Sequence, residues 1–561
     1  MTNETNQNNP SMARAAIERL YIAMRHLFIR GSYKPLGVSG EALIEALMTL
    51  QPEIYGSIAH AEKIELNGLL YIFKRLPKGI EKARYIKLIS REGFEESFEP
   101  IIASARRRNC YRIDEEQIFI EMTRGRSDIY ESLTHLTCMF IEAQKILRNA
   151  KQSKDKLRRE WTMLETIVQK EQRGEDFNKQ VAFTYLSTLL GRTFAETALA
   201  YEQFEKGDSV NSLFHIIYWL GKRAIEEEQE GKDREITFSN ALRDKIGHHI
   251  YGEIWANRIK QFLIDNDLVH RPLHIISANT HSVMNTFYGK AALGDSVKDL
   301  TLEEVAKQLS LSENHHLRQK VKTYATRRGM MQLDDESGMN ISVQLFDTEQ
   351  INWSKIPDEV HFNKEYITTQ KPVIFVMDYA FGEQAFELMD ELLKPYDDEI
   401  KQNLNVKSIS IMGKAGILKG DKGDIMLPNA HIFEGTADNY PFENDLSVAD
   451  FQNIPVVEGP MVSVLGTSIQ NRDILRFFHD SSWQVIGLEM EGAHYQKAIQ
   501  AASKIRQSVA ADIKVRYAYY ASDNPLQSGQ TLASGSLGLV GVRPTYLITS
   551  KFLDKVLGTK S

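Results

Sequence analysis

The chain has very little cysteine. Cys110 and Cys138 are the only two in its 561 residues, too few for a disulfide framework or a thiolate zinc site. No run of about 18 apolar residues occurs, so no membrane-spanning helix is predicted. The HExxH metalloprotease motif is also absent. With these classes excluded, the 42% hydrophobic and 25% charged composition predicts a soluble globular protein.

Proline is absent between Pro100 and Pro272. Because proline breaks helices, its absence favours a helical region. Apolar residues there and before it recur at every third or fourth position, as in residues 17–28 and 133–147. This is the pattern of helices with one buried face. The sequence therefore predicts an all-helical domain of unknown role over residues 13–266.

The net charge of −7 gives no support for binding along a nucleic acid backbone. Basic runs at residues 106–108 and 154–159 are interpreted as solvated helix faces, since acidic residues are interleaved nearby. No nucleic acid and no membrane is expected as a partner. Residues 1–12 are polar and predict a disordered tail, not a secretion signal. A cytoplasmic location is therefore expected.

Residues 267–370 predict a connecting α/β segment. The apolar run at 273–278 ends in Asn279 and His281, as a strand with polar groups at its end would. We expect this strand to join the sheet of the following domain. A nucleophilic pair of His281 and Ser282 is disfavoured, because adjacent residues on a strand end point apart and no orienting acid follows.

A zinc site at His249 and Glu253 is also disfavoured. The two residues lie one helical turn apart, but no third ligand follows in the sequence. No metal and no cofactor is expected.

From residue 371 to residue 561, short apolar runs alternate with helical patterns. Residues 373–377, 406–412, 485–488 and 515–521 predict strands. Such alternation favours a mainly parallel central sheet covered by helices on both faces. The predicted fold class is thus α plus α/β, with the helical domain followed by a three-layer α/β domain.

Two of these strands end in carboxylates. One lies in Gly487-Leu-Glu-Met-Glu-Gly-Ala-His-Tyr495, which contains Glu489 and Glu491, and the other in Arg516-Tyr-Ala-Tyr-Tyr-Ala-Ser-Asp523. In open α/β sheets, ligands bind at the carboxyl ends of the strands. The three acids are therefore candidates for one polar site.

These motifs resemble the nucleoside phosphorylase and nucleosidase superfamily, which cleaves the N-glycosidic bonds of nucleosides. The similar segments are Met490-Glu-Gly-Ala493 and Ala521-Ser-Asp523. Residues 373–383 are similar to the family's first strand and acidic loop. Residues 408–416 and 423–427 are similar to its Gly-Ser-Ala-Gly turn and its Gly-Asp-Ile-Val strand. The resemblance covers only residues 371–550 and implies a phosphorylase-like domain.

The resemblance also implies roles for single residues. Asp523 matches the acid that protonates the leaving base, and Glu383 matches the glutamate that contacts the attacking water. Glu491 and Met490 match the residues that hold the ribose. Further substrate contacts are expected from Glu489, Gly413, Lys414, Ser522 and Ile469.

Departures from the family pattern favour hydrolysis. Lys414 stands where phosphorolytic members carry serine, and no arginine follows the first strand. Lys414 could still meet inorganic phosphate, or a 5′-phosphate on the substrate. Three alternatives stay open: a nucleosidase for a purine nucleoside or nucleotide, a phosphorylase, and an inactive nucleoside or nucleotide sensor. Aromatic contacts with the base are expected from Tyr379, Phe381 or Phe433.

Structural roles remain as alternatives for the same residues. Asp523 could cap a turn before Pro525, Met490 could pack in the core, and Glu491 could form an ion pair. Members of the resembled family assemble as dimers or hexamers, so a homo-oligomer is also a hypothesis.

Overall fold

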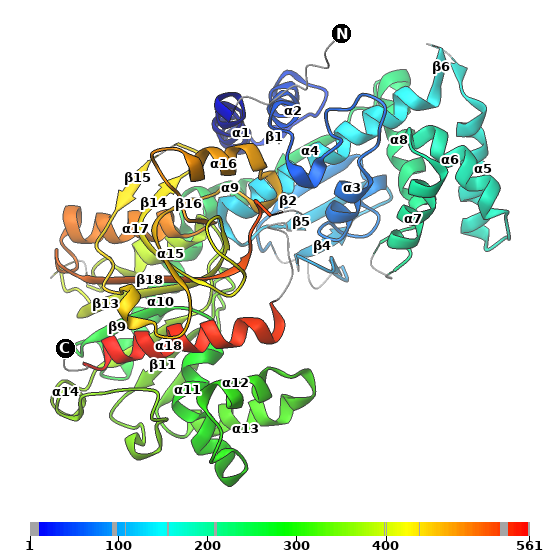
Figure 1. Ribbon diagram of the computed structural model, residues 1–561. Helices are drawn as coiled ribbons and strands as arrows, with labels where there is room; N and C mark the ends of the chain where they lie inside the picture. Colours follow the sequence, from blue (N-terminus) through cyan, green and yellow to red (C-terminus); the bar gives the residue numbers. More distant parts are fainter. Residues whose placement is uncertain are drawn as a thin grey trace. The chain divides into compact units, whose positions relative to one another are not determined.

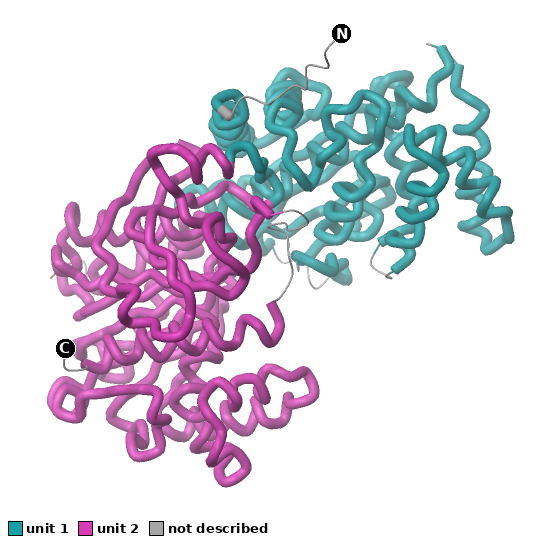
Figure 2. Tube along the Cα trace, viewed as in Figure 1, with its two compact units in different colours: residues 1–248, 468–474 teal, residues 249–467, 475–561 magenta. Residues whose placement is uncertain are grey.

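A computed structural model describes residues 10–92, 98–106, 108–153, 156–206, 210–397, 399, 401–436, 438–527 and 537–558. The chain forms two compact units (Figures 1 and 2). One comprises residues 1–248 and 468–474, and the other residues 249–467 and 475–561. Residues 1–9 of the expected tail, and residues 107, 154 and 155 of the basic runs, lie outside the described residues.

The first unit is rich in helices. These are α1 (Pro10–Arg30), α2 (Val38–Leu50), α3 (Leu66–Phe73), α4 (Gly125–Ala150), α5 (Arg159–Arg173), α6 (Lys179–Leu190), α7 (Phe194–Phe204), α8 (Leu213–Glu230) and α9 (Asn240–Gly247). Since α1 begins at Pro10, residues 10–12 of the expected tail are helical.

The prediction of an all-helical first domain is wrong. The unit contains a six-stranded sheet in the order β1-β8-β2-β5-β4-β3, and a separate β6-β7 pair. The strands are β1 (Ser32–Tyr33), β2 (Tyr85–Ile89), β3 (Ile101–Ile102), β4 (Asn109–Arg112), β5 (Gln117–Glu121), β6 (Lys151–Ser153), β7 (Lys156–Leu157) and β8 (Glu235–Phe238). Each of these strands has five residues or fewer. Such a strand is too short for an alternation of apolar and polar residues to be recognised among the long helical segments around it.

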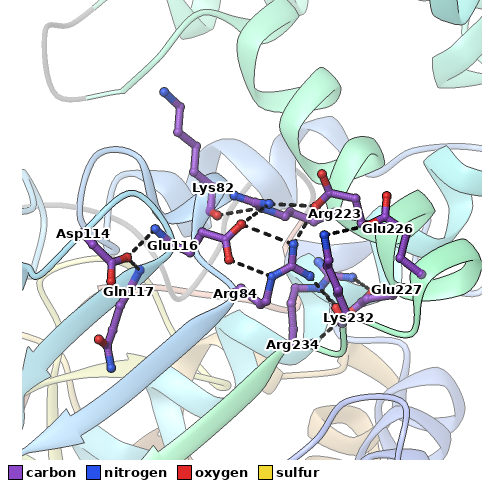
Figure 3. Close-up of polar contacts among 11 residues, drawn as sticks. Lys82, Arg84, Asp114, Glu116, Gln117, Arg223, Glu226, Glu227, Lys232 and Arg234 are labelled. Atoms are coloured by element: carbon purple, nitrogen blue, oxygen red, sulfur yellow. Dashed lines mark hydrogen bonds and ion pairs between the residues drawn. The ribbon is translucent and has the colours of Figure 1, made fainter.

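Ion pairs of two buried arginines join α8 to the sheet of this unit. Figure 3 shows Arg84, which precedes β2, donating to Glu116 at 3.0 Å and to Glu226 of α8 at 2.7 Å. Arg223 of α8 donates to the same two carboxylates. Because a buried charge without a partner is strongly destabilising, this network fixes α8 against the start of β2.

The second unit holds a ten-stranded sheet. Its strands are β9 (Leu273–Ser277), β10 (Met330–Leu333), β11 (Val343–Asp347), β12 (Val373–Met377), β13 (Val406–Ile417), β14 (Ile425–Phe433), β15 (Asn439–Pro441), β16 (Val456–Ser463), β17 (Gly487–Glu489) and β18 (Lys514–Asp523). β9 lies between β12 and β13 and is parallel to both. Residues 267–370 thus supply β9, β10 and β11 to the same sheet as β12.

The sheet is mixed, so the expectation of a mainly parallel sheet is not confirmed. Parallel pairs are β9–β12, β9–β13, β13–β18, β14–β16 and β16–β17. Antiparallel pairs are β10–β11, β11–β12, β13–β17, β14–β15 and β14–β18. The long strands β13 and β14 carry register shifts and pair with different neighbours along their length. As a result, β13, β17, β16, β14 and β18 close into a circuit.

Helices cover both faces of this sheet (Figure 1). They are α10 (Ile250–Asp265), α11 (Thr280–Leu293), α12 (Leu302–Ser310), α13 (His315–Thr326), α14 (Lys364–Gln370), α15 (Gln384–Leu392), α17 (Gly492–Gln500) and α18 (Val542–Val556). The chain passes between the two units within α16 (Arg472–Asp480). On one face, Phe287 of α11 and Phe552 of α18 belong to the same core as Met412 of β13. The α/β and layered character of this domain therefore agrees with the sequence.

Among the described residues, no helix has the length and apolarity needed to cross a bilayer.

Candidate functional site

A cavity of about 740 Å³ lies where strands of the second unit end. Asn279 follows β9 and Tyr379 follows β12, while Lys414 and Tyr520 come from the adjacent strands β13 and β18. The helical part of the wall comes from α11, α12, α18 and the segments beside them. It includes His281, Met284, Asn285, Leu309, Leu311, Glu313, Arg318, Val542, Thr545 and Tyr546. The size falls in the range of small-molecule sites.

Three polar side chains meet at the strand ends. The hydroxyl of Tyr379 interacts with the side chains of Asn279 and Tyr520. Asn279 also caps α11, since its Oδ1 accepts from the N–H of Ser282 at 2.8 Å. Desolvation, with Tyr520 close by, raises the pKa of Tyr379 well above its ordinary value, so the phenol is neutral. The contact joins the ends of β9 and β12 to β18.

His281 contributes to the same wall. Desolvation by the surrounding protein lowers its pKa, and the nearby guanidinium of Arg318 lowers it further. The imidazole is therefore neutral at pH 7. It offers the cavity one hydrogen-bond donor and one acceptor.

Lys414 and Tyr520 face the cavity from one pair of strands. They are register partners in the parallel β13–β18 pair, so they share a face of the sheet. Gly413 and Tyr519 form the preceding pair and face the other way. A Cβ added at Gly413 would lie 2.7 Å from Cδ1 and Cε1 of Tyr519. The ring of Tyr519 therefore leaves no room for a side chain at position 413.

Asp523 follows a β-bulge in β18 and is not in the described cavity wall. Ala415 pairs with Ala521, but Gly416 pairs with Asp523, so Ser522 is an extra residue in β18. A one-residue shift moves the following side chain to the other face. Asp523 therefore shares the face of Lys414 and Tyr520, about 7 Å further along the strand. The side chain of Asp523 is buried, with 4% exposed.

Ser522 holds this bulge. Its hydroxyl lies 3.0 Å from the carbonyl oxygen of Ala415 and also contacts Oδ1 of Asp523. The serine thus links β13 to the carboxyl group that follows it.

Glu489 is a fully enclosed anchor of the turn after β17. Its Oε2 accepts from the N–H groups of Glu491 and Gly492, and its Oε1 contacts Ser463 and lies 3.3 Å from Nδ1 of His431. Burial raises its pKa, but hydrogen bonds from His431, Ser463 and Gly492 bring it below the ordinary value. Glu489 is therefore ionised and fixes the turn.

Glu491 and Glu383 lie close to each other. Oε1 of Glu491 accepts from the N–H of Gly382 at 3.0 Å, and Glu383 is the next residue, at the start of α15. Burial lowers the pKa of His494, while the charges of Glu383 and Glu489 act in the opposite direction. The Glu491–Gly382 bond thus joins the turn after β17 to the loop after β12.

Of the predicted site residues in the second unit, Lys414 is in the described cavity wall. Asp523 and Ser522 are not in that wall, but they lie on the same strand pair as Lys414. The other predicted residues outside the wall are Glu383, Gly413, Glu489, Met490 and Glu491. Ile469 lies in the first unit, within residues 468–474.

Of the three aromatic candidates, Tyr379 is in the described wall, whereas Phe381 and Phe433 are not. Polar groups were expected at the end of the 273–278 strand, and Asn279 and His281 do line the cavity. Asn285, Tyr520 and Tyr546 were not predicted. In a regular strand, side chains alternate between the two faces, so Tyr520 and Asp523, three positions apart, would be expected on opposite faces. The bulge at Ser522 breaks this alternation, so the sequence did not identify Tyr520. Within the described ranges, no group of three or more His, Cys, Asp or Glu side chains could hold a metal ion.

A family model described as "Family of unknown function (DUF6909)" matches residues 41–297 and 302–558. No curated protein matches the chain.

Three solved structures show remote similarity. A putative methylthioadenosine nucleosidase from Weissella paramesenteroides ATCC 33313 has 11% identity over 50% of this chain and 99% of that chain, with a TM-score of 0.29. The 5′-methylthioadenosine/S-adenosyl homocysteine nucleosidase of Campylobacter jejuni has 10% identity over 51% and 99%, with a TM-score of 0.30. Futalosine hydrolase of Helicobacter pylori strain 26695 has 10% identity over 51% and 99%, with a TM-score of 0.29. Similarity at this level assigns no activity.

Proposed function

The chain belongs to the DUF6909 family, and because the description of that family gives no activity, we propose from the site itself that the protein hydrolyses the N-glycosidic bond of a purine nucleoside or nucleotide. In this proposal Asp523 protonates the departing base and Glu383 activates water. Glu491 and Met490 hold the ribose.

The observation that carries the proposal is the bulge at Ser522. It gives Asp523 the same face as Lys414 and Tyr520, both of which line the cavity. Cleavage of a ribosyl C–N bond needs a proton donor at the leaving base, because the neutral base leaves more readily than its anion. A buried aspartic acid on the strand pair that supplies Lys414 and Tyr520 to the cavity suits that task.

The cavity also offers the contacts that a nucleoside needs. The rings of Tyr379 and Tyr520 provide aromatic surface for a base, and Lys414 provides a cation for a 5′-phosphate. The anchored carboxylate of Glu489 keeps the turn that carries Glu491 rigid. The Ser522 hydroxyl supports the site by its contact with the carbonyl oxygen of Ala415 in β13, and Gly413 leaves room for the ring of Tyr519.

A second candidate is a nucleoside or nucleotide sensor that binds without cleaving. The specific observation in its favour is that Glu383 and Glu491 are outside the described cavity wall. Moreover, one oxygen of Glu491 already accepts from Gly382. A sensor requires the cavity but no water-activating base.

Incubating the full-length protein with purine nucleosides and their 5′-monophosphates, with and without inorganic phosphate, tests these proposals. Free base is measured by chromatography and binding by calorimetry. Release without phosphate supports hydrolysis, whereas release only with phosphate indicates phosphorolysis. Binding without release supports the sensor. The absence of both binding and release would reject every form of the proposal.

A further inference from the structure

Two buried polar side chains face each other across the helical part of the cavity wall. Asn285 of α11 and Tyr546 of α18 both line the cavity, although each is only 4% exposed. The Nδ2 group of Asn285 donates to the hydroxyl oxygen of Tyr546 at 2.8 Å. This bond joins residues 261 positions apart in the sequence.

This pair leaves hydrogen-bonding capacity unused. Among the described residues, Oδ1 of Asn285 has no hydrogen-bond partner. The Tyr546 hydroxyl accepts from Asn285, so its own hydrogen is available to a further acceptor. Burial raises the pKa of Tyr546, while the bond with Asn285 lowers it less, so the phenol keeps its proton at neutral pH. The pair therefore combines one acceptor with one donor.

Leaving such a group unsatisfied is unfavourable. A buried carbonyl without a hydrogen bond has lost its hydration and gained no partner in return. The neighbouring residues Met284, Leu309 and Val542 are apolar and supply no polar atom from their side chains. A ligand that brings a donor beside an acceptor would satisfy both groups at once.

We propose that Asn285 and Tyr546 recognise the polar edge of the nucleobase. Adjacent donor and acceptor atoms occur on the six-membered ring of 6-amino purines and of 6-oxo purines. Unsubstituted purine has no group at position 6 and lacks this pairing. The inference rests on the proposed function, and it adds that the substrate base carries an amino or oxo group at position 6.

The apolar side chains around the pair suit the flat ring that bears this edge. Met284 and Val542 adjoin Asn285 and Tyr546 in the wall, and Tyr546 shares a small apolar cluster with Leu302, Ala306 and Val542. An apolar surround strengthens a hydrogen bond by excluding water. It also penalises a ligand that leaves Oδ1 of Asn285 unpaired.

The test compares ligands in the full-length protein by calorimetry. The probes are adenosine, inosine and purine riboside, which has hydrogen at position 6. The wild-type protein is expected to bind adenosine or inosine at least about tenfold more tightly than purine riboside. Asn285→Leu and Tyr546→Phe should each reduce this preference.

The double variant Asn285→Leu/Tyr546→Phe removes both polar groups, so neither is left without its partner. It is expected to bind the three ribosides with equal affinity. Thr286→Val is the matched control, because Thr286 adjoins Asn285 on α11, is buried, and is not in the described cavity wall. The preference of the Thr286→Val protein for ribosides with a position-6 substituent should equal that of the wild type.

The outcomes separate this inference from the proposed function. If the wild type binds ribosides and the double variant keeps the full preference for position-6 substituents, the base-edge assignment is wrong and the nucleoside site stands. Equal wild-type affinities for the three probes would also overturn the base-edge assignment alone. If the wild type binds neither these ribosides nor their 5′-monophosphates, the proposed function and this inference both fail.

Discussion

The N–H of Gly382 donates a hydrogen bond of 3.0 Å to Oε1 of Glu491, 109 residues further along the chain. Gly382 belongs to the loop after β12, whose Tyr379 lines the cavity. Glu491 belongs to the turn after β17, which Glu489 holds through two backbone N–H groups. The cavity wall at Tyr379 thus depends on a carboxylate outside that wall.

Replacing Glu491 should loosen the loop that carries Tyr379. In Glu491→Ala the N–H of Gly382 loses its acceptor, so backbone amides of residues 378–384 should exchange hydrogen several-fold faster than in the wild type. Glu491→Gln keeps an oxygen acceptor and should exchange at the wild-type rate. Hydrogen exchange followed by mass spectrometry measures this without a ligand. Peptides covering β9 are the internal reference, and equal exchange in all three proteins would contradict the anchoring role.

Asp523→Asn tests the proposed acid. The amide has nearly the same size but cannot donate a proton to a leaving base, so base release should fall at least about 100-fold. Nucleoside binding and the melting temperature should change little. Asp512→Asn, an exposed site just before β18, is the control and should keep full activity. An Asp523→Asn protein that releases base at the wild-type rate would remove Asp523 from the mechanism.

Lys414→Met tests whether the cavity recognises a 5′-phosphate. A charge-assisted hydrogen bond from Lys414 to phosphate would be lost, so binding of a nucleoside 5′-monophosphate should weaken about tenfold or more. Binding of the matching nucleoside should be unchanged. Lys407→Met, at the other end of β13 and outside the described wall, is the control. Equal weakening for nucleoside and nucleotide would argue against a phosphate contact.

Apolar runs in the sequence identified much of the second unit's sheet. Residues 373–377 form β12 as predicted, and residues 515–521 lie within β18. These strands are buried on both faces, so their sequences are mostly apolar and easy to distinguish from loops. The strand that ends before Asn279 was recognised for the same reason.

Other parts of the site depend on information that local sequence does not carry. The bulge at Ser522 changes which face Asp523 occupies, yet a register shift leaves the sequence pattern of β18 unaltered. The pairing of Asn285 with Tyr546 follows from the packing of α11 against α18, which periodicity cannot specify. The sheet of the first unit was missed because strands such as β8 are only four residues long.

Gly413→Ala should destabilise the second unit. The new methyl group would lie 2.7 Å from two ring carbons of Tyr519, which is 1% exposed and packed near the rings of His431 and Tyr517. Overpacking of this kind costs roughly 1–3 kcal/mol, so the melting temperature should fall by several degrees. Gly466→Ala is the control, because no atom lies within 4 Å of its added Cβ. A Gly413→Ala protein as stable as the control would show that Tyr519 does not require the glycine.

The buried carboxyl group of Glu142 should make the stability of the first unit depend on pH. Burial within α4 raises its pKa to about 7, although Lys145 and the N–H of Glu65 act in the opposite direction. Its ordinary value in the unfolded chain is 4.5. Between these two values the folded state binds more protons than the unfolded state, so the contribution of Glu142 to stability falls as pH rises through about 7.

Glu142→Gln removes this titration, so the stability of the variant relative to the wild type should rise between pH 5 and pH 8. Thermal unfolding of both proteins at intervals of one pH unit measures the difference in melting temperature. Glu115→Gln is the matched control, since Glu115 is exposed in the same unit, and its difference from the wild type should stay constant across the range. If the difference in melting temperature between Glu142→Gln and the wild type also stayed constant, Glu142 would keep one protonation state between pH 5 and pH 8. Its charge would then be controlled by Lys145 and not by burial.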